Sequence, residues 1–377
     1  MKRWVWILPA VLLMVLPVRA EAVDLALTSR SAVLMEKSTG EILFTQNEHD
    51  VLEPASVTKV MTLLLTMEAI DSGKIGYDDV VTVSDYAASM GGSQVFLSPG
   101  EEITVEELLK SVCVSSGNDA AVALAEHVSG VTELFVEEMN NRARALGMND
   151  THFVNPTGLT AEGHVTSAWD IALMSRELLL HHPDIRRFTT IWMDTIRGGT
   201  FGLSNTNKLV RYYDGCTGLK TGYTERAGYC ISATAEKDGM ELIAVIMKGE
   251  TADKRNEDAK TLLNYGFSTY QLTDITPAEP LPALPVTLGQ EDAVSLTLPP
   301  EGTTVLRRKG EAAPETALDI PDAVTAPVAQ GQQVGELTVT FPGGDTARLP
   351  VLAAEEVARR TWGQLFADVA RRGLFMK

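Results

Sequence analysis

Strands are predicted at both ends of the segment 23–275, and helices fill its middle. Two strands joined by a turn are predicted at residues 31–36 and 41–45. Three more strands are predicted at 218–224, 228–236 and 240–248, the last two joined by an Asp-Gly hairpin turn. A sheet assembled from both ends of a segment and packed with helices is the simplest way to bury these apolar faces. The sequence therefore predicts an α/β domain with one antiparallel sheet.

Several helices are predicted between these strands. The nearly continuous apolar run at 60–70 is typical of a helix buried on all sides. Thr104 and Glu107 have the spacing of a capping box at the start of another helix. Asp119 is expected to cap the following helix at 120–128. Two further helices are predicted at 167–180 and 252–270.

The composition changes near residue 276, where a proline-rich stretch marks a linker. Short runs separated by glycine and proline turns follow, and they predict a small all-β sandwich domain at 276–352. In the last segment, 353–377, apolar residues share one helical face and the segment is basic. This pattern predicts an amphipathic helix that lies in a membrane surface, which makes the membrane an expected partner. A helix docked on its own domain is the alternative.

The first 22 residues have the features of a secretory signal. Lys2 and Arg3 precede a short apolar stretch at 4–18, and the small residues Ala20 and Ala22 follow it. Two prolines interrupt the stretch, whereas a spanning helix needs about 20 uninterrupted apolar residues. The mature protein is therefore expected to be secreted to the outer face of the cytoplasmic membrane.

Charge and cysteine content exclude several classes of function. The net charge is −18, and no run of Lys or Arg lies outside the termini, so nucleic acid is not an expected partner. The three cysteines form no C-x-x-C pair and the six histidines form no ligand pattern, so neither a metal site nor a cofactor is expected. Cys216 and Cys230 flank a predicted hairpin turn. Whether they form a disulfide depends on a strand register that sequence does not determine.

Three short motifs carry candidate chemistry, and the first is Ser56-Val-Thr-Lys59. A spacing of three residues in the first turn of a helix places the hydroxyl and the amine on the same face. The helix N-terminus also directs backbone N–H groups toward a developing oxyanion. A serine needs a base, and a lysine can serve if burial or a nearby like charge such as Lys220 lowers its pKa.

The other two motifs are Ser116-Gly-Asn118, in a predicted turn between helices, and Lys220-Thr-Gly222, on a predicted strand. Ser116 could relay a proton, and Asn118 could hold a substrate amide. Lys220 and Thr221 can grip a carboxylate by charge and by hydroxyl. Gly222 would let a substrate backbone approach closely. Each motif alone is also compatible with ordinary surface or turn structure, and it is their order that carries the signal.

In this order, S-x-x-K, S-x-N and K-T-G mark penicillin-binding proteins and serine β-lactamases. Together with Asn155-Pro-Thr-Gly-Leu159, they make residues 23–275 resemble the low-molecular-mass penicillin-binding proteins, which are serine-type D-Ala-D-Ala carboxypeptidases. The β domain and the tail fit that family more loosely. The resemblance implies the fold shared by DD-peptidases and serine β-lactamases.

The resemblance also implies a mechanism and site residues. Ser56 would attack the carbonyl between the two terminal D-alanines of a peptidoglycan stem peptide, D-alanine would leave, and water would hydrolyse the acyl-enzyme. Lys59 would be the base, and Ser116 and Lys220 would relay protons. The backbone N–H groups of Ser56 and Tyr223 would form the oxyanion hole, and the third motif would hold the terminal carboxylate.

One departure from the pattern bears on β-lactams. Class A β-lactamases use a glutamate to activate the deacylating water, whereas Asn155-Pro-Thr-Gly-Leu159 contains no carboxylate. Slow deacylation, with penicillin held as a stable adduct, is therefore expected. Two alternatives stay open: a related acyl-serine enzyme, either a β-lactamase or a peptidoglycan DD-endopeptidase, and a non-catalytic wall-binding protein. The complete set of motifs argues against the non-catalytic alternative.

Overall fold

The computed structural model describes residues 23–299, 303–344 and 346–366. The described chain divides into two compact units between Thr269 and Tyr270. The predicted signal segment, residues 1–22, lies outside the described residues. Each unit is described separately below.

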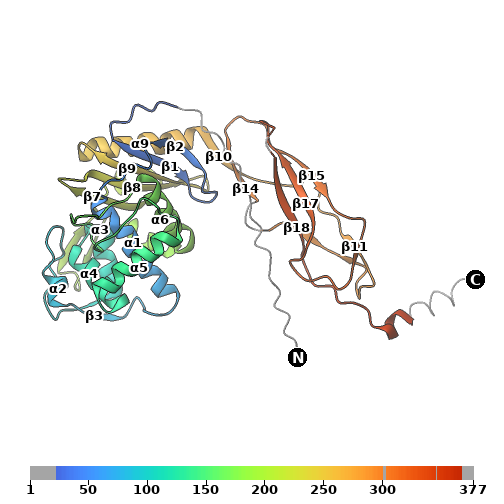
Figure 1. The fold of residues 1–377 in the computed structure, drawn as a ribbon, viewed down its shortest axis with the longest axis horizontal. Coiled ribbons are helices and arrows are strands. Elements are labelled where there is room, and N and C mark those ends of the chain that lie inside the picture. Colours follow the sequence, from blue (N-terminus) through green and yellow to red (C-terminus); the bar gives the residue numbers. More distant parts are fainter. Residues whose placement is uncertain (1–22, 300–302, 345, 367–377) are drawn as a thin grey trace, which may run out of the picture. The chain divides into compact units, whose positions relative to one another are not determined.

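The first unit contains a five-stranded antiparallel sheet in the order β2-β1-β9-β8-β7 (Figure 1). Its strands are β1 (Ser31–Glu36), β2 (Ile42–Gln46), β7 (Cys216–Thr224), β8 (Gly228–Lys237) and β9 (Met240–Gly249). The N-terminal strand β1 pairs with β9, so both ends of the unit build one sheet, as the sequence predicts. Strand β7 lies at an edge of this sheet. Between β8 and β9, Asp238 and Gly239 both have positive φ (51° and 77°), as a two-residue I′ turn requires.

Helices cover both faces of the sheet. The helical layer consists of η1 (Ala55–Thr58), α1 (Lys59–Asp71), α3 (Val105–Ser115), α4 (Asn118–Ser129), α5 (Thr132–Ala145) and α6 (Ala168–His181). Helix α9 (Ala252–Thr269) packs on the other face (Figure 1). Side chains alternate accordingly: Val33 and Val245 belong to the core under the helical layer, whereas Leu34 and Leu242 meet α9 at Gly266.

Shorter elements complete the first unit: α2 (Asp85–Ala88), β3 (Val80–Thr82), β4 (Glu102–Thr104), η2 (Pro183–Ile185), α7 (Arg186–Thr189), β5 (Met193–Ile196), β6 (Phe201–Ser204) and α8 (Leu209–Tyr212). Helix α1 is buried along nearly its whole length, which confirms the prediction from its apolar sequence. Thr104 caps α3 as predicted, because its hydroxyl accepts a hydrogen bond from the backbone N–H of Glu107.

The prediction that Asp119 caps a helix is wrong. Helix α4 begins at Asn118, two residues before the predicted start, so Asp119 lies inside the helix. The Asp119 carboxylate accepts hydrogen bonds from the backbone N–H groups of Val95 (3.0 Å) and Leu97 (3.1 Å). Asp119 is buried. Its carboxylate therefore binds a loop from elsewhere in the chain to the start of α4.

The register of β7 and β8 answers the question about the disulfide. Cys216 lies opposite Ala235, and Cys230 lies opposite Gly222. The two thiols are therefore several residues apart along the hairpin, and both are free, as is Cys113.

The second unit is all-β, as predicted. Its strands are β10 (Tyr270–Asp274), β11 (Leu284–Thr287), β12 (Ala293–Val294), β13 (Leu296–Thr297), β14 (Thr304–Arg308), β15 (Glu315–Asp319), β16 (Val324–Thr325), β17 (Gln333–Thr340) and β18 (Thr346–Ala353). They form sheets in the orders β10-β14, β12-β11-β16 and β13-β18-β17-β15. A small core that includes Val328, Leu337 and Val351 holds these strands together.

The chain after β18 differs from the single helix predicted at 353–377. Val357 is 1 % exposed and pairs with Val328, and Arg359 pairs with Gly289, so this stretch belongs to the all-β unit. Val357 belongs to the β core, and this burial and strand pairing outweigh the helical pattern of the segment. A helix begins only at Trp362, and residues 367–377 lie outside the described residues. Within the described part of the chain, no helix combines the length and apolarity needed to cross a membrane.

Candidate active site

The first motif places a serine beside a buried lysine. Ser56 lies in the short 3-10 turn η1, and Lys59 is the first residue of α1. The Lys59 amine lies 2.9 Å from Ser56 Oγ, 2.6 Å from Asn118 Oδ1 and 2.8 Å from the carbonyl oxygen of Thr157. Lys59 is fully buried. The spacing of the first motif predicts the contact with Ser56. The contact with Asn118 is not predicted, because the sequence suggested Asn118 as a ligand for a substrate amide. The third contact comes from a backbone atom that no side-chain pattern reveals.

The environment of Lys59 favours its neutral form. Burial lowers the pKa of Lys59 well below its usual range, and the positive charge of Lys220 lowers it further. The buried carboxylate of Asp119 acts in the opposite direction but is the weaker influence. A neutral amine within hydrogen-bond reach of a serine hydroxyl is the arrangement that general-base activation of a nucleophile requires.

The second motif is fixed at the junction of α3 and α4. Ser116 ends α3 in the left-handed conformation (φ 61°, ψ 31°), and its buried Oγ has no hydrogen-bond partner among the described residues. Asn118 donates from Nδ2 to the carbonyl oxygen of Gly91 at 2.6 Å while its Oδ1 faces Lys59. The Asn118 amide is thus held at both ends, and the Ser116 hydroxyl is left available.

The third motif lies on the edge strand β7, directly against η1. A Cβ on Gly222 would lie 2.8 Å from the backbone nitrogen of Ser56 and 2.9 Å from the carbonyl oxygen of Pro54. Glycine is therefore needed here because the chain's own backbone approaches closely. Tyr223, the next residue, is 56 % exposed, and its ring stacks on Tyr229 with 4.3 Å between centroids.

Lys220 and Thr221 lie on the same strand and are both buried. Burial lowers the pKa of Lys220 to about 7. The neighbouring Cys113 acts to raise this pKa and the charge of Arg255 acts to lower it, both less strongly than burial. The Lys220 amine donates to the carbonyl oxygen of Thr221 at 3.0 Å, and the Thr221 hydroxyl donates to Thr206 at 2.8 Å. Sequence reasoning missed Thr206 and Arg255, because neither belongs to a motif.

The segment 155–158 forms a tight loop against η1. Asn155 Oδ1 accepts hydrogen bonds from the backbone N–H groups of Thr157 (3.1 Å) and Gly158 (2.7 Å). Gly158 has φ +82°, and a Cβ there would lie only 1.8 Å from the carbonyl oxygen of Ala55. The loop therefore fits against the serine-bearing turn only with glycine at this position, and it thereby presents the Thr157 carbonyl to Lys59.

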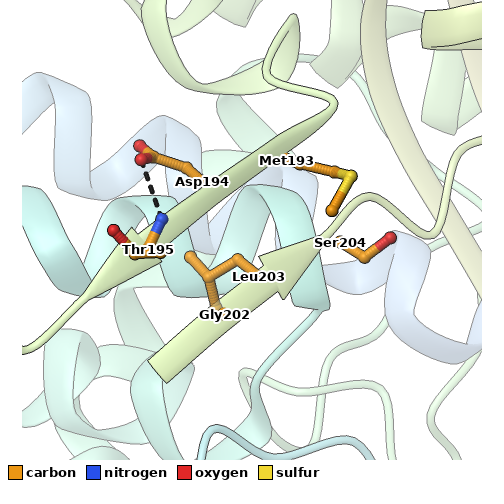
Figure 2. A pocket seen from close by; sticks show the side chains of 6 residues that line it. All are labelled: Met193, Asp194, Thr195, Gly202, Leu203 and Ser204. Atoms are coloured by element: carbon orange, nitrogen blue, oxygen red, sulfur yellow. Dashed lines mark hydrogen bonds between the residues drawn. The ribbon is translucent and has the colours of Figure 1, made fainter. Parts of the chain in front are cut away.

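A surface hollow of about 480 Å³ lies elsewhere on the first unit, over the β5–β6 hairpin (Figure 2). Met193, Asp194 and Ser204 are among the residues that line it, and the Asp194 carboxylate accepts a hydrogen bond from the backbone N–H of Thr195. It shares no residue with the cluster around Ser56. The chemistry described above is therefore not located in this hollow.

A serine paired with a buried lysine, a second serine and a second lysine with a lowered pKa define an acyl-serine enzyme. The family described as D-alanyl-D-alanine carboxypeptidase matches residues 18–251, and the penicillin-binding protein 5 C-terminal domain matches residues 274–359. The chain belongs to the D-alanyl-D-alanine carboxypeptidase family, and it is a serine hydrolase of that class.

Individual relatives agree with this assignment. The D-alanyl-D-alanine carboxypeptidase DacF of Bacillus subtilis is 44% identical over 89% of this chain and 87% of its own length. Penicillin-binding protein 5 from Haemophilus influenzae has a similar structure, with a TM-score of 0.75 and 29% identity over 88% of this chain and 98% of that one. Ampicillin-bound penicillin-binding protein D2 from Listeria monocytogenes has a TM-score of 0.60 and 32% identity over 65% of this chain and 100% of that one. The resemblance and fold class inferred from the motifs are confirmed.

Replacing Gly158 tests whether the loop must fit against η1. In Gly158→Ala the new methyl group collides with the Ala55 carbonyl, so we expect acylation by penicillin to slow at least about tenfold. The free energy of unfolding should fall by about 3 kcal/mol or more. Stopped-flow acylation and chemical denaturation measure the two effects.

Gly163→Ala is the matched control in the same segment. Gly163 has a similar φ of +79°, but the nearest atom to an added Cβ is 3.9 Å away. The free energy of unfolding of this variant should fall by only about 1–2 kcal/mol, because alanine is strained in the left-handed conformation. Its acylation rate should not change. Equal effects of the two substitutions would show that the contact with Ala55 is unimportant.

Proposed function

We propose that Ser56 is the nucleophile of the carboxypeptidase reaction and that Lys59 is its general base. The observation that carries this assignment is the 2.9 Å contact between Lys59 Nζ and Ser56 Oγ, made by a fully buried amine with a lowered pKa. Lys59 takes the hydroxyl proton as Ser56 Oγ attacks the carbonyl carbon between the two terminal D-alanines. The tetrahedral intermediate then collapses to an ester on Ser56.

The leaving D-alanine needs a proton on its nitrogen, and we assign this delivery to Ser116 and Lys220. The Ser116 hydroxyl is buried and lacks a hydrogen-bond partner among the described residues, so it is available to relay a proton. Lys220 has its pKa lowered to about 7 and can lose or regain a proton near neutral pH. Water then hydrolyses the ester and frees Ser56.

The remaining site residues are proposed to bind the substrate. The backbone nitrogen of Ser56 lies beside β7, so the N–H groups of Ser56 and Tyr223 are the candidate oxyanion hole. The charge of Lys220 and the hydroxyl of Thr221 hold the terminal carboxylate. Asn118, which the sequence suggested as a ligand for the substrate amide, is already held by Lys59 and Gly91, so we assign it to fixing Lys59.

The substrate we propose is a peptidoglycan stem peptide ending in D-Ala-D-Ala, and β-lactams are covalent inhibitors of the same serine. The relative from Listeria monocytogenes was solved with ampicillin bound. The loop 155–159 supplies a backbone carbonyl to Lys59 and has no carboxylate to activate a deacylating water. Penicillin is therefore held as a long-lived ester.

The proposed location is the outer face of the cytoplasmic membrane. Residues 1–22 would direct secretion. The catalytic domain predicted at 23–275 would end at residue 269, because β10 pairs with β14 in the second unit. The all-β domain predicted at 276–352 would extend from residue 270 to residue 360. The segment that follows would anchor the protein in the membrane surface. Trp362 (88 % exposed) and Phe366 (78 % exposed) support this role, as do the basic residues of the last stretch of sequence.

Ser56→Ala tests the nucleophile. We expect no D-alanine release from a pentapeptide ending in D-Ala-D-Ala, no covalent labelling by fluorescent penicillin, and an unchanged melting temperature, because only one hydroxyl is removed. Labelling that survives would place the nucleophile at another residue. Rapid hydrolysis of penicillin by the unmodified enzyme would instead favour a β-lactamase.

The two lysines predict the pH dependence of turnover. Lys59 must be neutral to act as base, so kcat/KM should fall as the pH drops through its lowered pKa. Lys220 must be charged to hold a carboxylate, so kcat/KM should also fall as the pH rises through about 7. A bound carboxylate favours the charged form of Lys220 and so raises its pKa in the substrate complex. The fall of activity at high pH should therefore occur at a higher pH for kcat than for kcat/KM. A kcat/KM that stays constant from pH 6 to 9 would contradict this role for Lys220.

The membrane anchor is tested by replacing both Trp362 and Phe366 with alanine. Loss of two large apolar side chains should weaken sedimentation with anionic lipid vesicles at least about tenfold. Tyr86→Ala, at an aromatic residue exposed on the first unit, is the control and should bind as before. Undiminished binding of the double variant would rule out this anchor. A truncation for the same purpose should end after Arg360, because Val357 belongs to the β core.

A further inference from the structure

A buried histidine lies behind the turn that carries Ser56 and Lys59. His164 is only 2 % exposed, and its Nε2 lies 2.8 Å from the hydroxyl oxygen of Thr58. On the other side of the ring, Nδ1 accepts a hydrogen bond from the backbone N–H of Val154 at 2.9 Å. Since a backbone N–H can only donate, Nδ1 carries no proton. The proton of the neutral ring is therefore on Nε2, which donates it to Thr58.

This histidine connects the two segments that meet at the Lys59 amine. Thr58 immediately precedes Lys59, and Val154 immediately precedes the loop whose Thr157 carbonyl accepts from Lys59 at 2.8 Å. The contact of Lys59 with Thr157 and the bridge through His164 therefore hold the same turn and the same loop together at two points. No hydrogen bond joins His164 itself to Ser56 or Lys59.

We propose that His164, as a neutral ring protonated on Nε2, is a positioning residue that keeps the Thr157 carbonyl and the Lys59 amine in place for attack by Ser56. The inference rests on the proposed role of Lys59 as the base. It adds a residue that lies outside the three motifs and acts only through its neighbours. The chemistry requires one acceptor and one donor on opposite sides of the ring, which only the neutral form provides.

The surroundings of His164 keep the ring neutral. Burial, with a smaller contribution from the neighbouring His152, lowers the pKa of His164 to about 4. The ring of Phe153, at 5.8 Å between centroids, and the hydroxyl of Thr58 are the uncharged groups that face it. Protonation would place an N–H on Nδ1 opposite the N–H of Val154, so that two donors would face each other and the bridge would break.

The test compares His164→Gln with His164→Leu in the full mature chain. A glutamine can accept from Val154 through Oε1 and donate to Thr58 through Nε2, whereas leucine can do neither. Acylation by fluorescent penicillin is followed over a range of concentrations, which separates the dissociation constant of the first complex from the rate constant of ester formation. Melting temperatures are recorded for both variants.

At pH 7 we expect His164→Gln to acylate within about threefold of the unmodified enzyme and His164→Leu to acylate at least about thirtyfold more slowly. The dissociation constant should change little, because the hydrogen bonds of the His164 ring go to Thr58 and Val154. A folded His164→Leu protein that acylates at the unmodified rate would overturn the proposal. If the unmodified enzyme itself takes no label, the proposed function fails instead.

A pH series supplies a second readout, which also applies if His164→Leu does not fold. Protonation of Lys59 slows acylation at low pH in every variant by the same factor. This factor cancels when the acylation rate of a variant is divided by that of the unmodified enzyme. The ratio of His164→Gln to the unmodified enzyme should be constant above about pH 5.5 and should rise as the pH falls through about 4, because glutamine does not titrate. His152→Gln is the matched control and should show no such rise. A constant ratio down to the pH at which circular dichroism detects unfolding would overturn the proposal.

Discussion

The active site depends on burying one amine. Lys59 has no access to water, and its three polar contacts come from three separate segments: the turn before it, the start of α4 and the loop at 155–158. An unpaired charge would be costly in this place, so burial favours the neutral amine, whose lone pair can accept a proton. The same contacts fix its position. The structure thus couples the chemistry of the lysine to the packing of the domain.

Close backbone packing brings the other groups to that amine. Gly222 and Gly158 each let a strand or loop approach η1 at distances that no Cβ would allow. Asp119 binds the loop at Val95 and Leu97 to the helix that carries Asn118. These contacts involve peptide groups, so the site is assembled mainly by main chain, and the motif side chains are added to that scaffold.

Much of this could be predicted from the sequence. The strand pattern indicated the sheet, and the order of the three motifs indicated the residues that meet at Ser56, because side-chain type and spacing carry that information. Contacts made by carbonyl oxygens could not be predicted, since Thr157 contributes only its backbone to Lys59. Asp119 was wrongly predicted to cap a helix, and a helix was wrongly predicted around Val357, where the chain is extended. Tertiary contacts outweigh the local helix signals at both places.

The pairing of β1 with β9 has a consequence for when the enzyme becomes active. The first described residues are also joined to α9, since Asp258 accepts hydrogen bonds from Thr28 and Ser29 across a separation of about 230 positions. Such non-local contacts form slowly and only after the intervening chain has been made. A chain still emerging from the ribosome therefore lacks the sheet that supports β7. The nucleophile matures only when the complete domain has folded.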